Sequence, residues 1–452
     1  MAYQNWDDHD RSQKYSAEFI ADAYLESVAE NKDAMIFTIG DNDTFLLWYA
    51  QEIEGYRTDV RVINTSLLQT DWYIDQMKRQ AYQSTPIPGQ LVHKQYAHGV
   101  REAIYYQKRT DNRWNIKDFV NWITSDDPST RSSRGAGEYK QDFYYYPTNK
   151  LRIPVNKENV LKSGIVKPED ADKIVDYIDI TLPGAIDKAR IVMLDILANN
   201  DWKRPIYFTG GSMDSAEYLW MKDYLQLDGL VYKLVPIKTP IDKNNPYDMG
   251  RIDSELMYNI VKRWTWGNMG KEGIYLDPET RKNSIIFRGN LARLTEQLIA
   301  EGKTAKASEI IDIAMKNMPV DAYGYYFTLD PFIEGSYKVG KKEQARAIAL
   351  QVIKKYQEEL NYYTHLPAGE LNSNAKRIQY CIDRYGEVVL LSETLDKEFY
   401  AAQWAIFKDK AGLFMGEKEL EEYFKGAASQ AALDSLRNSL IDTTATSDST
   451  EE

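Results

Sequence analysis

One segment near the start of the chain constrains its fold more than any other. Residues 35–39 form a short apolar run rich in β-forming side chains, Gly40 ends the run, and an amphipathic pattern opens at Phe45. This order predicts a strand, a tight turn and the N-terminus of a helix. In open α/β sheets, such turns lie at the carboxyl ends of strands, where ligands usually bind. The turn carries four polar side chains, which are Asp41, Asn42, Asp43 and Thr44.

Two interpretations of residues 40–44, here called the acidic turn, stay open. Asp, Asn and Thr are favoured helix N-caps, and carboxylates near a helix N-terminus interact well with its dipole. One carboxylate is enough for capping, whereas Asp41 and Asp43 supply two, which favours contact with a polar ligand or a metal ion. The turn is not a phosphate loop, because it lacks repeated glycines and a Lys and its charge repels phosphate.

Strand and helix patterns alternate around the acidic turn. Residues 60–63 predict a second strand that ends in Asn64, and Asp71 is placed to cap the helix that follows. A strand that ends in a glycine turn recurs at residues 204–212. The alternation predicts an α/β domain with a parallel or mixed sheet, Rossmann-like layering and right-handed crossovers. Asn64 and Asp71 are therefore expected near the acidic turn, at the same edge of the sheet.

The aromatic content is high, with 33 Tyr and 10 Trp in 452 residues. Such side chains fill cores, and they also form platforms for sugars or peptides, so composition does not separate these uses. Residues 117–124 have the pattern of a short helix, and a polar loop follows at 125–137.

From about Asn283 the sequence changes to helical patterns only. Small and apolar residues recur with the spacing of tetratricopeptide helical hairpins, and Gly302 and Gly340 are in register as turn residues. A third hairpin is predicted at residues 399–427. We therefore expect an α/β domain at 1–250, a linker at 251–282, an all-α tetratricopeptide-like domain at 283–438 and a disordered acidic tail at 439–452.

Charge and cysteine content narrow the functional classes. The formal net charge of −12 without a large basic cluster argues against nucleic acid as a partner. Cys381 is the only cysteine, which excludes an intrachain disulfide and predicts a buried small side chain. No stretch of the sequence has the apolar length of a membrane span, and no secretory signal opens the chain.

A second polar cluster lies at the very start of the chain. It consists of Asp7, Asp8, His9, Asp10 and Arg11. Its acids could hold a hard cation, or the cluster could simply cap the next helix. Domains usually fray where they begin, so polar groups of this kind so close to Met1 predict that the chain was cut from a longer protein. No cofactor is predicted.

Several of these segments together resemble the soluble C-terminal half of a bacterial multi-spanning membrane family of unknown function, which is similar to protein O-mannosyltransferases of the GT-C type. The resemblance covers roughly the first 250 residues. It rests on residues 7–12, 40–45, 47–52, 57–61, 70–74 and 204–208.

The resemblance implies that the chain is the periplasmic, extracytoplasmic portion of a membrane-bound glycosyltransferase. In GT-C enzymes the catalytic acid lies between early membrane spans and the donor is a lipid-linked sugar, so no catalytic residue is assigned here. The expected partners are the upstream transmembrane region and an acceptor protein or peptide. The alternatives are a freestanding sugar- or nucleotide-acting enzyme with its site at the Gly40 and Gly210 turns, and a structural or assembly module.

Overall fold

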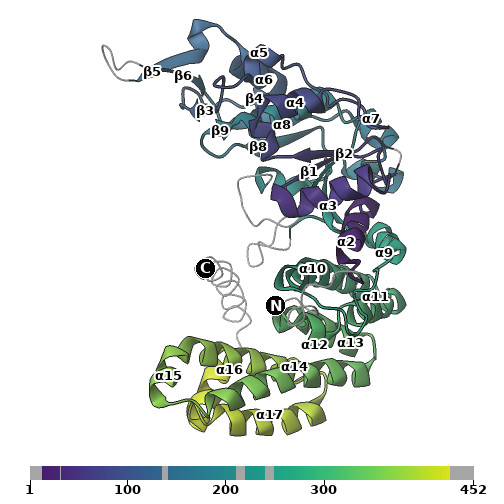
Figure 1. The fold of residues 1–452 in the computed structure, drawn as a ribbon, viewed down its shortest axis with the longest axis vertical. Coiled ribbons are helices and arrows are strands. Elements are labelled where there is room, and N and C mark those ends of the chain that lie inside the picture. The colour runs from purple at the N-terminus through teal and green to yellow at the C-terminus, as the bar shows by residue number, and fades with distance from the viewer. Residues whose placement is uncertain (1–12, 31, 135–140, 210–218, 240–248, 428–452) are drawn as a thin grey trace, which may run out of the picture. The chain divides into compact units, whose positions relative to one another are not determined.

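The structure is a computed structural model that describes residues 13–30, 32–134, 141–209, 219–239 and 249–427 (Figure 1). The chain divides into two compact units. Ser12–Ile241 and Met249–Asn268 form one, here called the sheet unit, and Met269–Glu452 makes up most of the other, here called the helical unit. None of the helices in the described residues is both long and apolar enough to cross a membrane.

The described residues of the sheet unit form three sheets, with strand orders β11-β12-β10-β1-β2, β5-β6-β3-β9 and β4-β7-β8. The strands are β1 (Met35–Thr38), β2 (Arg61–Asn64), β3 (Ala103–Tyr106), β4 (Trp114–Asn115), β5 (Arg131–Arg134), β6 (Gln141–Tyr146), β7 (Lys150–Pro154), β8 (Tyr177–Thr181), β9 (Ile186–Asp187), β10 (Ile206–Thr209), β11 (Leu225–Asp228) and β12 (Val231–Leu234). The α-helices are α2 (Ser16–Glu26), α3 (Gly40–Glu52), α4 (Asp71–Met77), α5 (His93–Tyr96), α6 (Ile116–Thr124), α7 (Lys157–Lys162), α8 (Lys188–Asn200) and α9 (Ser254–Arg263).

The five-stranded sheet is mixed. Strand β1 pairs in parallel with β2 and β10, and β12 runs antiparallel to β10. Every residue of β1, β2 and β10 is buried, which requires cover on both faces. In Figure 1, helices α3 and α8 lie on opposite sides of β1 and β2, and α2 lies beside α3. The sequence prediction of a parallel or mixed sheet with alternating helices is confirmed for this part of the chain.

Helix α3 begins at Gly40 instead of at Phe45, where the sequence pattern placed its start. Gly40 has a φ of +73°, a conformation that side chains with a Cβ adopt only with strain. This single residue reverses the chain at the end of β1, so no separate loop is needed. The acidic turn is therefore the first turn of the helix.

Buried arginines hold the strands at their amino ends. Arg61, the first residue of β2, donates through Nη2 to the carbonyl oxygens of Arg79, Ser84 and Thr85 at 2.8 to 3.0 Å. Because burial disfavours its charge, the pKa of Arg61 lies below the ordinary arginine value. The segment that follows α4 is thereby fixed under the sheet.

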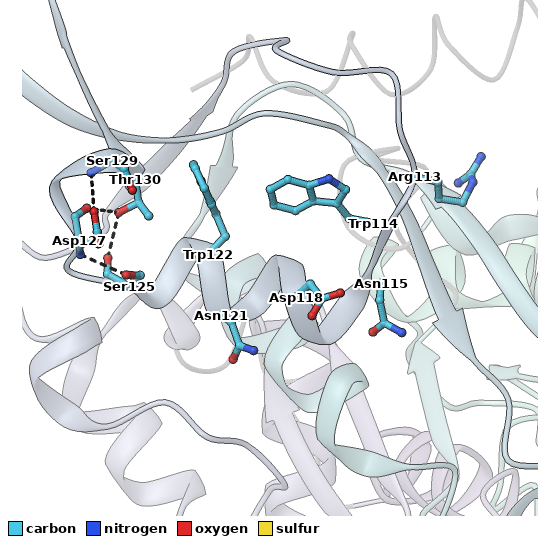
Figure 2. Close-up of a pocket in the computed structure, with 10 residues that line it drawn as sticks. All are labelled: Arg113, Trp114, Asn115, Asp118, Asn121, Trp122, Ser125, Asp127, Ser129 and Thr130. Carbon is cyan, nitrogen blue, oxygen red and sulfur yellow. Dashed lines mark hydrogen bonds between the residues drawn. The ribbon is translucent and has the colours of Figure 1, made fainter.

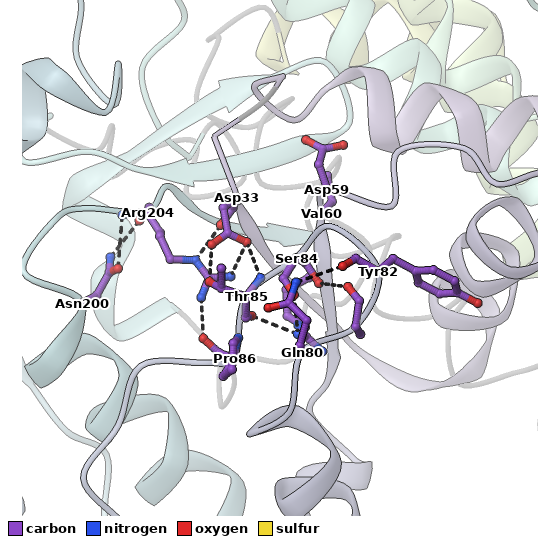
Figure 3. Close-up of polar contacts among 12 residues, drawn as sticks. Asp33, Asp59, Val60, Gln80, Tyr82, Ser84, Thr85, Pro86, Asn200 and Arg204 are labelled. Carbon is purple, nitrogen blue, oxygen red and sulfur yellow. Dashed lines mark hydrogen bonds and ion pairs between the residues drawn. The ribbon is translucent and has the colours of Figure 1, made fainter.

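Arg204, just before β10, has a matching role (Figure 3). Its Nη2 pairs with Asp33 Oδ1 at 3.0 Å, and its Nη1 donates to the carbonyl oxygen of Pro86 at 2.7 Å. Burial lowers the pKa of Arg204 to about 10. Asp33 also accepts a hydrogen bond from the Thr85 backbone N–H at 2.9 Å. The pair of Arg204 with Asp33 therefore ties the start of β10 to the segment before β1.

The described helical unit contains only helices as regular elements. Its α-helices are α10 (Pro278–Ala300), α11 (Thr304–Asn317), α12 (Val320–Tyr323), α13 (Asp330–Lys338), α14 (Lys342–Tyr363), α15 (Ala368–Ser373), α16 (Ala375–Leu390), α17 (Lys397–Ala411) and α18 (Glu417–Ala427). The predicted helical C-terminal region is thus confirmed, and the linker predicted for 251–282 holds α9 and the start of α10. The predicted tail at 439–452 lies outside the described residues.

Two helix pairs match the predicted hairpins. Gly302 joins α10 to α11 with a φ of +75°, and Gly340 joins α13 to α14 with a φ of +82°. Ala307 and Ala345, which follow these turns in register, are completely buried, so the second helix of each pair can approach its neighbours closely. Whether these pairs form a tetratricopeptide-like array stays a prediction.

We predict that Arg61→Met lowers the free energy of unfolding by about 3 kcal/mol, because it leaves three backbone carbonyl groups, the buried one of Ser84 among them, without their donor. Chemical denaturation monitored by circular dichroism measures the change. Arg109→Met is the matched control, since Arg109 is exposed and its side-chain contact to Gln107 is long, at 3.4 Å. Equal stability of the two variants would show that Arg61 does not hold this edge.

Candidate functional site

Three neighbouring strands end in polar residues at one edge of the five-stranded sheet. Thr38 ends β1, Asn64 ends β2 and Thr209 ends β10, and each is at most 1% exposed. Because β1, β2 and β10 are parallel, their carboxyl ends meet at this edge. The edge is therefore the place where an α/β sheet usually binds a ligand.

Asn64 joins the end of β2 to the first turn of α3. Its Nδ2 donates to the carbonyl oxygen of Gly40 at 3.1 Å and to Thr44 Oγ1 at 2.8 Å, which uses both amide hydrogens. Its Oδ1 accepts a hydrogen bond from the backbone N–H of Leu67 at 2.9 Å. The sequence-based expectation that Asn64 lies beside the acidic turn agrees with this geometry, and its contacts make it a positioning residue.

The hydroxyl of Thr44 is likewise fully used in hydrogen bonds within the fold. Its hydroxyl donates to the carbonyl oxygen of Gly40 at 2.6 Å and lies 2.7 Å from the hydroxyl of Thr38. Together with the contact from Asn64, these interactions occupy the donor and both acceptor positions of the Thr44 oxygen. We call Thr38, Thr44 and Asn64 the strand-end latch. Its side chains hold the acidic turn in place and have little capacity left for a ligand.

The interpretation of the acidic turn as a helix cap is corrected by the structure. The N-cap position is Ile39, and no side-chain hydrogen bond caps α3 there. Asp41 and Asn42 are exposed residues within the first helical turn. The carboxylate of Asp41 interacts favourably with the helix dipole at this position, but it does not close the helix end.

Asp43 is more buried than Asp41 and Asn42. Burial raises its pKa and outweighs the opposite effect of the Thr209 hydroxyl. The Thr209 hydroxyl is itself buried and makes no hydrogen bond of ordinary geometry within the described residues. The carboxyl group of Asp43 and the hydroxyl of Thr209 therefore lie together at the ends of β1 and β10, which is a polar arrangement suited to a ligand.

The outer face of α3 carries large apolar side chains in place of the charged groups usual for an exposed helix. Phe45 is 55% exposed, Tyr49 is 43% exposed and Ile53 is 70% exposed. Their spacing of four residues places them in one line along the helix, starting beside the acidic turn. We call Phe45, Tyr49 and Ile53 the α3 stripe. An exposed apolar line of this kind next to polar groups marks a surface suited to binding.

Asp71 lies in a different environment. It is the first residue of α4 and not its N-cap, which is Thr70. The carboxylate accepts hydrogen bonds from the backbone N–H groups of His98 at 3.1 Å and Trp72 at 2.8 Å, and the bond from His98 is the main cause of its lowered pKa. Within the described residues, none of its hydrogen bonds reaches the acidic turn.

The structure does not place the remaining site candidates. Asp7, His9, Asp10 and Arg11, as well as the predicted turn at Gly210, lie outside the described residues. No group of three or more His, Cys, Asp or Glu side chains in the described residues is placed to hold a metal ion. A ligand-binding role for the acidic turn stays a prediction.

Thr38, Thr209 and the α3 stripe were not selected from the sequence. A signal for the two threonines was present, because a Phe-Thr pair ends both strands, at Phe37-Thr38 and Phe208-Thr209. The two phenylalanines are paired in register and stack with ring centroids 5.5 Å apart. The repeated pair therefore marks equivalent positions on neighbouring strands.

We predict that Asp43→Asn stabilises the protein at pH 7. The folded-state pKa of Asp43 is raised, so the ionised carboxylate costs stability above that pKa, and the cost disappears below the unfolded pKa of about 4. The gain in unfolding free energy should therefore be present at pH 7 and vanish as the pH falls to 4. Denaturation curves at both pH values measure it. A loss of stability at pH 7 would instead mean that the helix-dipole interaction outweighs burial.

Comparison with known proteins places most of the sheet unit in a family. The model of the TMEM260-associated domain 2 family matches residues 17–256, a range that runs from α2 into α9 and includes the acidic turn. Searches of curated proteins and of solved structures return no match.

Proposed function

The chain belongs to the TMEM260-associated domain 2 family, and we propose that it holds the acceptor protein for a membrane-bound glycosyltransferase of which it is the extracytoplasmic portion. The family name links the domain to a membrane protein. The glycosyltransferase activity of the GT-C type is inferred from the sequence resemblance. In this proposal the upstream membrane region binds the lipid-linked sugar and carries out the transfer. This chain has no catalytic step.

The observation that carries the proposal is the α3 stripe beside the acidic turn. A flexible acceptor segment needs apolar contacts to bind and polar contacts to be aligned. Phe45 and Tyr49 offer the apolar contacts. The exposed Asp41 and Asn42 offer the polar contacts, within one helical turn of Phe45. The strand-end latch fixes this helix end, so that the binding surface is preorganised.

The helical unit supplies a second surface in this proposal. Stacked helical hairpins of the tetratricopeptide type present concave faces to extended peptides. The pairs α10 with α11 and α13 with α14, each joined by a glycine, support such an arrangement. In the proposal, this unit binds a further segment of the acceptor.

A second candidate is a freestanding enzyme with its site at the strand ends. The raised pKa of Asp43 favours it, because perturbed carboxyl groups at a sheet edge are common in active sites. Sugar transfer or hydrolysis by this purified chain alone would support that candidate over the acceptor-holding role.

We predict that the purified chain shows no sugar transfer from a lipid-linked donor, and that the longer protein containing the upstream membrane region does. In that longer protein, Phe45→Ser combined with Tyr49→Ser should raise the KM for the acceptor about tenfold and leave kcat nearly unchanged, because an acceptor-holding surface contributes binding without chemistry. A radiolabelled-sugar transfer assay measures both constants.

Tyr105→Ser is the matched control for this experiment, because Tyr105 is 49% exposed on β3, away from α3 in the sequence and in the sheet order. It should leave both constants as they are in the wild-type protein. A double variant with an unchanged KM would contradict the role of the α3 stripe, and one with a lowered kcat alone would point to chemistry at this edge.

A further inference from the structure

A pocket in the sheet unit shares no residue with the acidic turn. It has a volume of about 540 Å³ and is lined by the segment from Arg113 to Thr130 (Figure 2). This volume lies in the range of pockets that bind small organic molecules, roughly 300 to 1,000 Å³. From its lining we propose that the pocket binds a neutral carbohydrate through Trp114 and Trp122.

The two indole rings form the apolar part of the pocket wall. Their centroids are 5.5 Å apart and their planes meet at 72°, so that they make two walls of a corner. Trp122 is held in this orientation, because its Nε1 donates to the carbonyl oxygen of Tyr145 at 2.8 Å. A pyranose ring has one face of C–H groups that is apolar, and an indole face is a suitable surface for it.

Part of the polar wall lies on the same face of α6 as Trp122. Asp118 and Trp122 are four residues apart in this helix, so the carboxylate lies in line with the Trp122 indole, while Trp114 belongs to β4 just before the helix. Figure 2 shows the indoles side by side above the side chains of Asn115, Asp118 and Asn121. The side-chain oxygen of Asn115 accepts a hydrogen bond from the backbone N–H of Lys117, and that of Asn121 accepts one from Gln90 Nε2. Neither of these two bonds uses the amide N–H groups of the asparagines.

The pocket wall offers both kinds of hydrogen-bonding group: the Trp114 indole N–H is a donor and the Asp118 carboxylate is an acceptor. Neither the Trp114 indole N–H nor the Asp118 carboxylate has a hydrogen bond or ion pair among the residues that the structure describes. A sugar hydroxyl donates one hydrogen bond and accepts two, and therefore matches a wall that offers both kinds of partner. An apolar ligand would leave the polar groups without partners.

The opposite side of the pocket is a preformed loop. Asp127 Oδ1 accepts from the backbone N–H of Ser129 at 2.8 Å, and Thr130 Oγ1 donates to the carbonyl oxygen of Asp127 at 2.7 Å. The hydrogen bonds from Ser129 also lower the pKa of Asp127, which keeps it negatively charged. A ligand therefore meets a wall that needs little ordering on binding.

The charge of the pocket disfavours anionic ligands. Arg113 is the cation at the pocket, and its guanidinium is already committed to the carbonyl oxygens of Leu151 and Ile180 at 3.0 and 3.1 Å. The acidic residues that line the pocket are Asp118 and Asp127. Phosphate, sulfate and sugar acids would be repelled, whereas a neutral hexose would not.

The inference does not depend on the proposed function, because it can be tested on this chain without a membrane region or an acceptor. The probes are a panel of neutral sugars, namely methyl mannoside, methyl galactoside, methyl glucoside and N-acetylglucosamine, with their disaccharides. Saturation-transfer NMR and titration of tryptophan fluorescence should show saturable binding of at least one probe, with a dissociation constant on the order of 1 mM. Glucuronate and a neutral proline-rich peptide should not bind.

Trp114→Ala should weaken binding about tenfold or more, and Asp118→Asn should weaken it severalfold. Asp118 is exposed, so its variant should keep the wild-type melting temperature and report on binding even if Trp114→Ala unfolds. Trp72→Ala is the control, because Trp72 is 56% exposed and does not line the pocket. The inference is overturned if no neutral sugar in the panel binds, if the peptide binds in place of the sugars, or if Trp72→Ala and Asp118→Asn have equal effects.

Discussion

The side chain of Asn64 links the two parts of the sheet unit on which the candidate site depends. Its amide donates to the first turn of α3 at Gly40 and Thr44, while its backbone belongs to β2. Besides this bridge, the helix end that carries Asp41 and Asp43 is joined to the sheet by the contact between the Thr44 and Thr38 hydroxyls and through the chain at Ile39. The Asn64 contact thus helps to set the position of the first turn of α3, from which the α3 stripe begins.

The two ends of the same sheet have different chemistry. At the amino ends, Arg61 and Arg204 direct their guanidinium groups at backbone carbonyls and at Asp33, and the contacts are internal to the fold. At the carboxyl ends, Asp43 has a raised pKa and the Thr209 hydroxyl makes no hydrogen bond of ordinary geometry within the described residues. The contacts at the amino ends of the strands therefore stabilise the protein. At the carboxyl ends, the partly buried carboxyl group of Asp43 lowers stability, which a purely structural role does not explain.

Periodicity was enough to predict the order of strands and helices and the change to helices near Asn283, since buried faces repeat along the sequence. The start of α3 was misplaced by five residues, because a glycine with positive φ joins strand and helix without a loop. Asn64 was correctly placed near the acidic turn from strand parallelism. The hydrogen bond from the His98 backbone to Asp71 joins segments that no local pattern connects, so the sequence did not predict it. The corner of Trp114 and Trp122 likewise depends on the anchoring of Trp122 by Tyr145, which is distant in sequence.

The central claim is that the acidic turn serves binding and not folding. The most direct measurement compares the melting temperature of this chain with sugar transfer by the longer membrane protein, both carrying Asp41→Ser together with Asp43→Ser. Serine is as good a helix-terminus residue as aspartate, so a structural role predicts little change in either quantity. Our account predicts an unchanged or higher melting temperature and a loss of transfer. Wild-type transfer with a wild-type melting temperature would contradict it.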